Sequence, residues 1–394
     1  MKNILERYLI FVLALLPVLS GCSGNEPEPS EPVPAPGILA DTYLKLSIAT
    51  AEAPTPASSY SRADNPEYEA PVIDNEKIKT MRFIIVDGSG HVEHNVLINQ
   101  TNKPDVLAET PSYRVSPNDT KKIYLIGNEA SLPEAVIKPF QNLSALDVFP
   151  SGWDDVTLSL PALAGEGAIQ APLYSVNQPI PMTEFHEVEI GAPKIDTDGN
   201  NVPYEVPLFV TRTAVKFTFN LTIKVDDATA ALVKEINVGN LIIDRIADKE
   251  YLFPKATTYE PAKAHDHRNR TVTAYTVPSD LNNISFPVSW TQGDDIFHYT
   301  SGPVYLPETK YTPEGATTDT PYTISLPIND AVLTAPLPNV PASYSLPRNT
   351  HVIVDITVEG PMIICEVRLV PYTGIYLNPD FGIERPAKPA TSTK

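Results

Sequence analysis

The chain has 394 residues, and its 48 acidic residues outnumber its 29 lysines and arginines, which gives a formal net charge of −19. This balance disfavours nucleic acid and anionic membrane surfaces as partners. The 41 prolines outnumber the 18 glycines. Because proline is excluded from helix interiors and central strands, they predict a β-rich protein with many proline-marked loops.

The N-terminus has the features of a signal peptide. An apolar run at 8–19 follows two basic residues and has about half of the ~20 residues that a membrane-spanning helix needs. The run ends in LSGC, which resembles a bacterial lipobox, whose cysteine receives a lipid and becomes the first mature residue. We therefore expect a signal peptide at 1–21 and a lipid on Cys22. The alternative is an ordinary secretory signal with a chance cysteine.

A tether is expected directly after this signal, at 22–37. Residues 23–37 contain five prolines and three glutamates and almost no apolar side chains, a composition typical of an extended linker. The glutamates close behind Cys22 also resemble the acidic export signals of surface-displayed lipoproteins, but a solvated linker has the same composition.

The other cysteine, Cys365, lies in a strand-like apolar run at 362–365. If Cys22 carries a lipid, no internal disulfide can form, so stability must come from packing. A catalytic cysteine needs an electropositive and accessible setting, which nothing near Cys365 in the sequence supplies. We expect a buried small apolar side chain.

Strand patterns begin at 39–49, where Leu44, Leu46 and Ile48 alternate with other residues in the period of a half-buried strand. A polar, proline-containing stretch follows at about 52–76. The next expected elements are a hairpin formed by 81–86 and 91–98 around a glycine-containing turn, a strand at 122–127, and short helical turns at 132–136 and 143–148.

The clearest pattern lies at 215–225, where apolar and polar residues alternate over eleven positions, a period that no helix could use. Further strands are expected at 236–246, 303–306, 322–326, 352–358 and 363–370. No long amphipathic helix separates them, so parallel βαβ architectures are disfavoured. The length and these patterns predict two antiparallel β-sandwich domains, at 38–205 and 206–394.

Five short segments follow the lipobox and the tether in a fixed order. They are IPMT at 180–183, LFVTRTAVK at 208–216, LPRN at 346–349, VPY at 370–372 and LNPDFG at 377–382. In this order and spacing they resemble the lipoprotein-precursor (type V) fimbrillin family of Gram-negative gut and oral bacteria. The resemblance covers nearly the whole chain.

This resemblance implies an all-β fold of two tandem transthyretin-like sandwiches that assemble by strand exchange. A protease removes the first strand of the precursor, and a strand of a neighbouring subunit fills the groove. The scheme is physically sound, because a missing strand leaves unpaired backbone groups and an apolar cleft that an extended segment restores.

Two segments of the chain fit this scheme. The strand at 39–49 would be the removable one, and the loop after it contains Arg62 and Ala63, a bond that a trypsin-like protease could reach. The alternative is that Arg62 is simply a solvated loop residue. Residues 363–381 form the candidate donor segment, and the alternative is an ordinary last strand of the second sandwich.

Enzyme motifs are absent from the sequence. It has no G-x-S-x-G, H-E-x-x-H, Walker or dinucleotide-binding sequence. The triplet at 265–267, His-Asp-His, could hold a metal, but it lies in a polar stretch typical of a loop. Asp196, Asp198 and Asn200 resemble the start of a calcium loop, but the glycine is at position four instead of six. Asp294 and Asp295 fit another turn, and we expect no metal and no cofactor.

These observations predict a non-enzymatic structural subunit of surface fimbriae, most simply a stalk subunit. Its partners would be other fimbrial subunits, the outer membrane through the lipid on Cys22, and a receptor on a host or bacterial surface. Its location would be the cell outer membrane, surface-exposed, and the fimbrium. The alternative is a monomeric lipid-anchored adhesin or glycan-binding lipoprotein, or a fimbrial anchor or tip subunit. Polymerisation separates these hypotheses.

Overall fold

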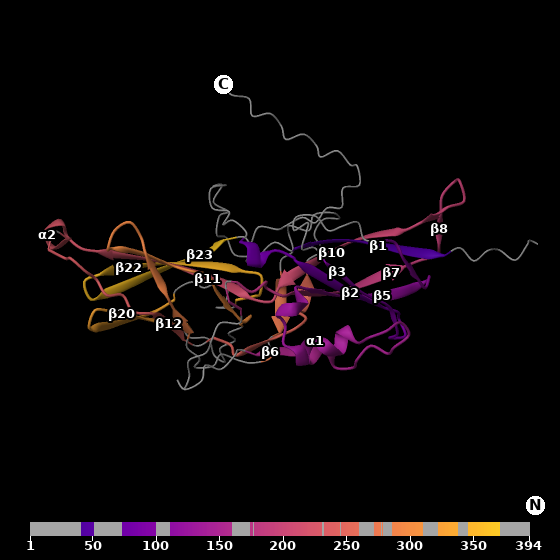
Figure 1. Cartoon of the computed structure of the whole chain (residues 1–394), viewed down its shortest axis with the longest axis horizontal. Coiled ribbons are helices and arrows are strands. Elements are labelled where there is room, and N and C mark those ends of the chain that lie inside the picture. The colour runs from indigo at the N-terminus through magenta and orange to yellow at the C-terminus, as the bar shows by residue number, and fades with distance from the viewer. Residues whose placement is uncertain are drawn as a thin grey trace, which may run out of the picture. The chain divides into compact units, whose positions relative to one another are not determined.

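The computed structural model describes residues 41–50, 73–99, 111–159, 174–175, 177–230, 232–244, 246–259, 272–276, 278, 286–309, 322–337 and 346–370. All of them belong to the compact unit Asp41–Lys394. Strands dominate, so the fold is all-β, as the sequence predicts (Figure 1). No helix among these residues is long and apolar enough to cross a membrane. The expected signal peptide, Cys22, the tether and the pair Arg62-Ala63 lie outside the described residues.

The first sheet has seven strands in the order β3-β2-β5-β7-β10-β1-β4. These strands are β1 (Thr42–Thr50), β2 (Thr80–Val86), β3 (Val92–Asn99), β4 (Tyr113–Val115), β5 (Asp119–Gly127), β7 (Met182–Ile190) and β10 (Tyr204–Arg212). The expected hairpin is confirmed as β2 and β3, which pair antiparallel. Gly90 in its turn has a φ of +91°, a conformation in which a residue with a Cβ would be strained.

Alternate residues of this sheet enter two different cores, because neighbouring side chains of a strand point to opposite faces. Phe83 and Ile85 of β2 pack in one core with the apolar side chains of β1. Ile84 and Val86 pack in the other core, where Ile137 of α1 (Glu134–Gln141) covers them. The remaining helical turns are η2 (Asp74–Glu76), η3 (Glu129–Ser131), η4 (Trp153–Asp155) and α2 (Asp227–Ala230).

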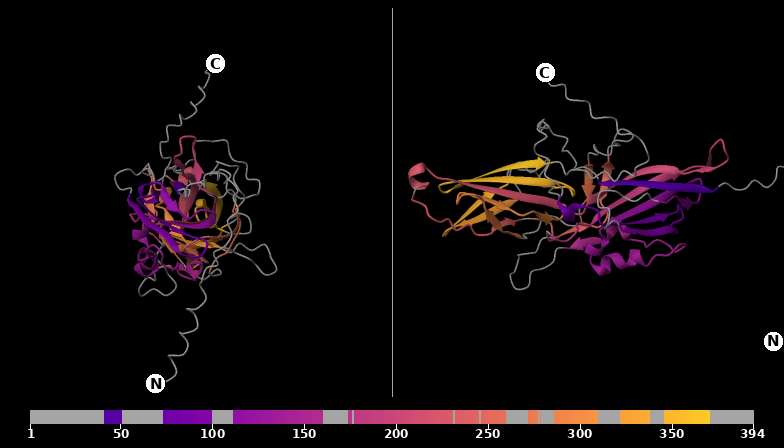
Figure 2. Two further views of the ribbon diagram at one scale, coloured as in Figure 1. Left: turned by 90° about the vertical axis from the view of Figure 1, so that its right-hand side faces the viewer. Right: turned by 45° about the horizontal axis from the view of Figure 1, so that its top comes forward.

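Two further sheets pack face to face around a third core (Figure 2). One has the order β17-β18-β11-β22-β23, with β19 also paired to β11, and the other has the order β16-β12-β20-β21. Their strands are β11 (Val215–Lys224), β12 (Leu241–Asp244), β16 (Phe286–Val288), β17 (Trp290–Gln292), β18 (His298–Ser301), β19 (Val304–Leu306), β20 (Thr323–Ile328), β21 (Ala331–Pro336), β22 (His351–Glu359) and β23 (Met362–Val370). The alternating pattern at 215–225 is thus confirmed as a central strand.

Three two-stranded sheets complete the described elements. They are β6 (Thr157–Ser159) with β13 (Lys249–Tyr251), β8 (Lys194–Ile195) with β9 (Asn201–Val202), and β14 (Lys255–Tyr259) with β15 (Val272–Thr276). The first of these joins distant parts of the chain. Leu252 and Phe253, directly after β13, are buried in the core that α1 covers.

The structure corrects the expectation of purely antiparallel sheets. β1 runs parallel to β10, and β11 runs parallel to β22. Parallel neighbours need a long connection, and more than a hundred residues separate the partners in each pair. The expected strand at 236–246 is shorter, as β12, and 143–148 is not helical, because Leu146 N–H donates to Val92 O and Val92 N–H donates to Asp147 O.

A buried ion pair joins η2 to one of the two sheets that pack around the third core. Glu76 is 1% exposed, and its Oε1 lies 2.7 Å from Nζ of Lys216 in β11. The hydroxyl of Tyr305 in β19 donates to the same oxygen at 2.9 Å. Arg212, at the end of β10, donates to Glu76 O at 3.2 Å and to Asn349 Oδ1 at 3.0 Å. These contacts hold η2 and the end of β10 against β11, β19 and Asn349, which lies two residues before the start of β22.

A second buried polar group involves the segment around β13. Arg348 donates to Leu252 O at 3.1 Å, and its backbone N–H donates to Glu308 Oε2 at 3.0 Å. Glu250 is 0% exposed and accepts the backbone N–H of Glu308 at 2.9 Å. Burial raises the pKa of Glu250 to about 8, against the opposing effect of the Arg348 guanidinium. Glu250 is therefore mostly protonated at neutral pH.

Replacing either partner of the Glu76–Lys216 pair should destabilise the protein strongly. Glu76→Gln leaves a buried ammonium without its counter-charge and should cost about 3–5 kcal/mol of unfolding free energy, as should Lys216→Met. The double variant should cost less than the sum of the two. Urea unfolding of the wild type, the two single variants and the double variant measures this coupling. Strictly additive effects would show that the two side chains do not stabilise each other.

The pH dependence of stability should report Glu250. Burial raises its pKa from 4.5 to about 8. The stabilising effect of this group is therefore complete below pH 4.5 and is lost as the pH rises through about 8. Between pH 6.5 and 8 the unfolding free energy should fall by up to about 1.4 kcal/mol per pH unit from this group. Glu250→Gln should remove this slope, which denaturant unfolding at both pH values measures.

This window lies above the pH range in which the buried His351 changes the stability. Burial lowers the pKa of His351 to about 4, so its stabilising effect is lost below pH 6.5 and is constant above it. An unchanged slope in Glu250→Gln would contradict the assignment.

Candidate functional site

The candidate site is the slot that β1 occupies in the first sheet. β1 lies between β10 and β4, so both of its backbone edges are paired. It pairs with β10 in parallel from Leu44↔Tyr204 to Thr50↔Val210, and with β4 antiparallel from Thr42↔Val115 to Leu44↔Tyr113. Figure 1 shows β1 and β10 side by side.

The alternating side chains of β1 are core side chains. Leu44, Leu46 and Ile48 are 0–1% exposed and belong to one cluster with Leu208 and Val210 of β10. Fully burying such a side chain is worth about 1.5–3 kcal/mol. If β1 left, three apolar pockets and two unpaired backbone edges would remain.

The ring of Tyr113 lines the side of this slot opposite β10. It packs edge-on against Phe83, with the ring centroids 5.0 Å apart, and it is 7% exposed. Burial raises the pKa of its hydroxyl to about 12, so the ring is neutral at physiological pH. The ring that lines this side of the slot therefore carries no charge.

The chain leaves the slot at Thr50 and is next described at Ile73, where η2 follows. Arg62 and Ala63 belong to the intervening 51–72 and lie outside the described residues, so the cleavage stays a prediction. The far end of this connection is held by the buried Glu76. A cut within 51–72 would leave η2 attached to Lys216 through its ion pair.

The first part of the candidate donor segment is a paired strand. β23 pairs antiparallel with β22 along its whole length, from Glu359↔Met362 to His351↔Val370. The rest of the segment, 371–381, lies outside the described residues. The part of 363–381 that the structure describes is thus the last strand of a sheet.

The other residues that the sequence singles out have structural roles where the structure describes them. Cys365 is 7% exposed, and burial raises the pKa of its thiol to about 12. Asp196 Oδ1 accepts the backbone N–H groups of Asp198 and Asn200, which makes this segment a turn. Asp295 accepts the backbone N–H of Phe297 at 2.7 Å. The triplet at 265–267 lies outside the described residues.

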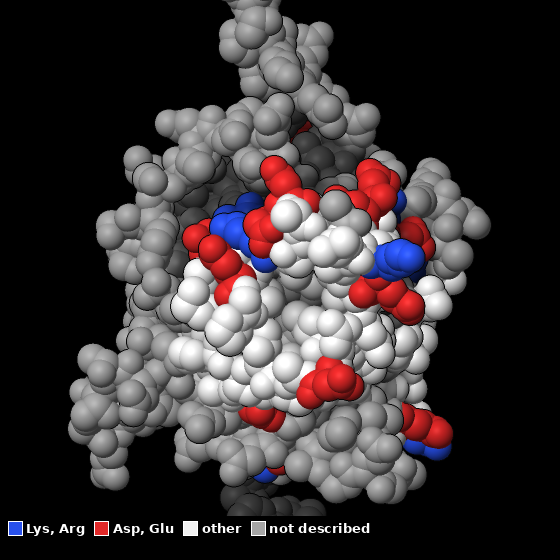
Figure 3. Space-filling model, turned by 90° about the vertical axis from the view of Figure 1, so that its left-hand side faces the viewer, with Lys and Arg blue, Asp and Glu red and all other residues white. Residues whose placement is uncertain are grey.

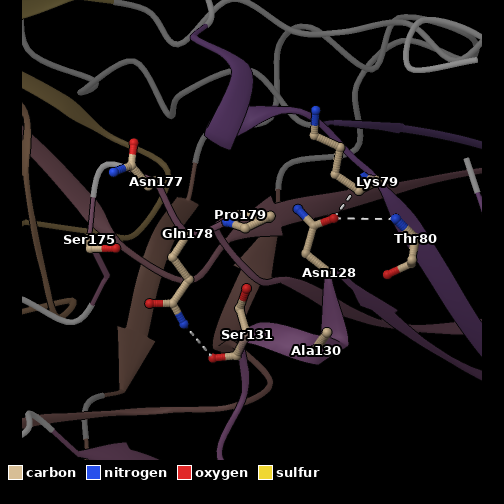
Figure 4. Close-up of a pocket in the computed structure, with 9 residues that line it drawn as sticks. All are labelled: Lys79, Thr80, Asn128, Ala130, Ser131, Ser175, Asn177, Gln178 and Pro179. Carbon is tan, nitrogen blue, oxygen red and sulfur yellow. Dashed lines mark hydrogen bonds between the residues drawn. The ribbon is translucent and has the colours of Figure 1, made fainter. Parts of the chain in front are cut away.

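A pocket of about 390 Å³ lies beside the start of β2 (Figure 4). Its polar side chains already serve the fold. Asn128 accepts the N–H of Lys79 at 2.7 Å and donates to Ile180 O at 2.7 Å, and Gln178 donates to Ser131 O at 3.0 Å. None of the nine lining residues is aromatic, so the pocket offers no ring on which a sugar could stack.

The face that includes α2 carries several acidic side chains and a few basic ones around a centre of uncharged residues (Figure 3). Leu232, next to α2, is 79% exposed, and Val225 at the end of β11 is 36% exposed. Asp226 does not form a ligand site, because it caps the turn through Thr229 N at 2.9 Å and Thr229 Oγ1 at 2.7 Å. This face therefore fits the acidic character of the whole chain.

Sequence reasoning missed both walls of the slot. β10 could have been found, because Val206, Leu208 and Val210 alternate in the period of a strand. β4 has three residues and carries no periodic signal. Its role as a wall of the slot is apparent only from its pairing with β1 in the structure.

No protein-family model matches the chain, and no curated protein matches it in sequence. Among solved structures it is similar to the tip fimbrial protein Mfa3 from Porphyromonas gingivalis, with 13% identity, 84% of this chain and 99% of that chain covered, and a TM-score of 0.49. It is also similar to a fimbrial assembly protein from Parabacteroides distasonis, with 9% identity, 84% and 99% covered, and a TM-score of 0.42. The fimbrial anchor protein Mfa2 from Porphyromonas gingivalis shares 9% identity, with 85% and 99% covered.

These neighbours are fimbrial proteins, the kind that the sequence resemblance predicts. The Mfa2 comparison has a TM-score of 0.39.

Substitutions in β1 should distinguish its buried face from its other face. Leu46→Ala should lower the unfolding free energy of the intact chain by about 2–5 kcal/mol, because it leaves a cavity in the core. Lys45→Gln, on the opposite face, should lower it by less than Leu46→Ala does, because it leaves no cavity in the core. Urea unfolding measures both, and equal effects would show that β1 does not occupy its slot in solution.

Proposed function

We propose that the chain is a structural subunit of bacterial surface fimbriae, most simply a stalk subunit that supports adhesion, and that subunits join by strand exchange. One observation supports this most directly. β1 contributes Leu44, Leu46 and Ile48 to a core, yet the single connection 51–72 joins it to the rest of the sheet. A single cut there would convert a core strand into a separable peptide.

Cleavage at Arg62 would make that cut. Arg62 lies twelve residues before η2, in a stretch rich in small, polar and acidic residues, and exposed loops of this composition are preferred sites of proteolysis. Glu76 and its ion pair with Lys216 would hold the new N-terminal segment in place. The vacated slot would then offer pockets at alternate positions and an unpaired edge on β10, which is the geometry that strand addition uses.

The donor strand of this scheme would come from the segment after β23. At 375–383 the sequence reads IYLNPDFGI, so Ile, Leu, Pro, Phe and Ile occupy every second position. This period matches the alternation of β1, whose pockets take every second side chain. A donor that begins here leaves the pairing of β23 with β22 intact.

The finer architecture belongs to the same proposal. Two tandem transthyretin-like domains would meet where β10 ends at Arg212 and β11 begins at Val215, a few residues after the boundary expected at 205/206. The strand β13 would tie the domains together, because it pairs with β6 and precedes two residues of the first domain's core.

The precursor would be anchored in the outer membrane by a lipid on Cys22, with its folded part exposed at the cell surface. Its partners would be further copies of this chain and accessory fimbrial subunits, and the fibre would carry it toward a receptor on a host or bacterial surface. The chain would bind no nucleic acid, in line with its net charge of −19, and would catalyse no reaction.

Brief exposure of residues 23–394 to an Arg-specific protease should produce one early cut after Arg62 and then filaments. Intact-mass analysis identifies the cut, and negative-stain electron microscopy detects the filaments. Arg62→Gln is the matched control, because it retains the other arginines, including Arg268 and Arg270 of the polar stretch. It should stay uncut at this position and monomeric.

Truncation after Val370 separates cleavage from donation. This variant keeps β23 and should be cut after Arg62 yet form no filaments. Filaments from the truncated chain would overturn the donor assignment. A wild-type chain that is cut and stays monomeric would contradict strand exchange and favour a monomeric lipid-anchored adhesin.

A further inference from the structure

We infer that β4 is a preformed second wall of the slot, and that Glu93 and His94 of β3 hold it in place when β1 leaves. The inference rests on the proposed function, because it concerns the molecule after release of β1. It assigns Glu93 and His94 as positioning residues for strand exchange. Neither of them contacts the exchanging strand in the contacts described for them.

Within the described part of the chain, β1 is the sole strand to which β4 is paired in the backbone ladder. β4 has three residues, so the loss of β1 removes its entire ladder. An unsupported strand of this length would not keep its position. The slot would then become one-sided, with β10 as its only backbone edge.

Side chains of β3 bind β4 from the side opposite β1. His94 Nε2 donates to the carbonyl oxygen of Arg114 at 2.6 Å. Glu93 Oε1 accepts the backbone N–H of Ser116, the residue after β4, at 2.8 Å, and also its hydroxyl. None of these hydrogen bonds involves β1, so they can persist after its departure.

Lys121 of β5 fixes the carboxylate that makes these bonds. Its side chain is 0% exposed and lies 3.0 Å from Glu93 Oε1. Its Nζ also donates to Ser116 Oγ at 2.7 Å and to Asp119 Oδ2 at 2.8 Å. A buried ammonium with three oxygen partners holds them tightly, because any displacement leaves the charge unsatisfied. This group therefore anchors the end of β4 to the body of the sheet.

Ring packing supports the same wall. Tyr113 of β4 contacts the Phe83 ring of β2 at 5.0 Å and the His94 ring at 5.2 Å between centroids. Val115 is 5% exposed and belongs to the same core. β3 and β4 stand at the two ends of the strand order, so these contacts bridge the two edges of the sheet.

A two-sided slot has a functional consequence. Neighbouring strands lie about 4.8 Å apart, so β10 and β4 leave room for one strand and offer it hydrogen-bond partners on both edges. An incoming strand can then form a parallel ladder with β10 and an antiparallel ladder with β4, as β1 does. Loss of the second wall removes one ladder and the pocket wall formed by Tyr113.

The test compares the same variants before and after release of β1. A sequence-specific protease site replaces 58–64 in the full chain, so the cut does not depend on Arg62. A fluorescent peptide of residues 41–51 is the probe, so the result does not depend on the donor assignment. The double variant Glu93→Ala/His94→Phe removes the hydrogen bonds to Arg114 and Ser116 but keeps a ring beside Tyr113.

After cutting, the double variant should bind the peptide at least about tenfold more weakly than the wild type. Its β4 amides, Tyr113–Val115, should exchange with deuterium faster once β1 is released. Before cutting, the exchange of these amides should match the wild type, because β1 holds β4. A residue with a purely structural role would change both states equally.

Two further variants sharpen the result. Glu93→Gln keeps an acceptor oxygen and should restore most of the affinity. Arg114→Gln is the matched control within β4 for amide exchange, because it removes only the side-chain contact with Asp41 on the β1 side, 2.7 Å away, and keeps the carbonyl group that accepts from His94; the β4 amides of the cut chain should exchange as in the wild type. Wild-type affinity in the double variant would overturn the inference while leaving the proposed function intact. No uptake of the peptide by the cut wild type would overturn strand exchange itself.

Discussion

The first sheet depends on the burial of three alternate side chains of β1. Leu44, Leu46 and Ile48 are 0–1% exposed, so the core cannot close without a strand in this position. The slot does not require this particular strand, however. A strand in the slot must offer backbone hydrogen-bonding groups on both of its edges and an apolar side chain at every second residue. Any extended segment with that pattern meets these requirements. Under the proposed strand exchange, the same constraint that makes β1 necessary for the fold would allow another strand to replace it.

The polar contacts between the cores make the rest of the subunit independent of β1. Glu76, Lys216 and Tyr305 form a buried group, and the contacts described between these three residues do not involve β1. Arg212 extends it at the end of β10, so the strand that forms one wall of the slot is fixed at its far end. Breaking such a group costs several kcal/mol, because the remaining charge stays buried. A subunit that exchanges one strand can thus keep the orientation of the strand's main partner.

Local patterns predicted several of the long strands but few of their neighbours. The alternation at 215–225 identified β11, and that at 39–49 identified β1. Such an alternation can be seen within a short stretch of consecutive residues. The parallel partners β22 and β10 could not be deduced, since pairing across more than a hundred residues depends on how the whole chain packs. The Glu76–Lys216 pair was hidden for the same reason, and β4 is too short to carry a pattern. The part of the site that the sequence predicted, the strand β1, is the part with a local signal.

Cutting the connection would change the thermodynamics of β1 more than its contacts. In the intact chain β1 is an intramolecular ligand, with an effective concentration on the order of millimolar for a flexible connection. After the cut that advantage is lost, while three buried aliphatic side chains still contribute about 1.5–3 kcal/mol each. A donor with five alternating apolar positions at 375–383 can bury more. A lipid on Cys22 would also keep the released strand at the membrane while the subunit moves into the fibre. Exchange would then be favoured by the larger apolar surface of the donor and by the separation of its competitor.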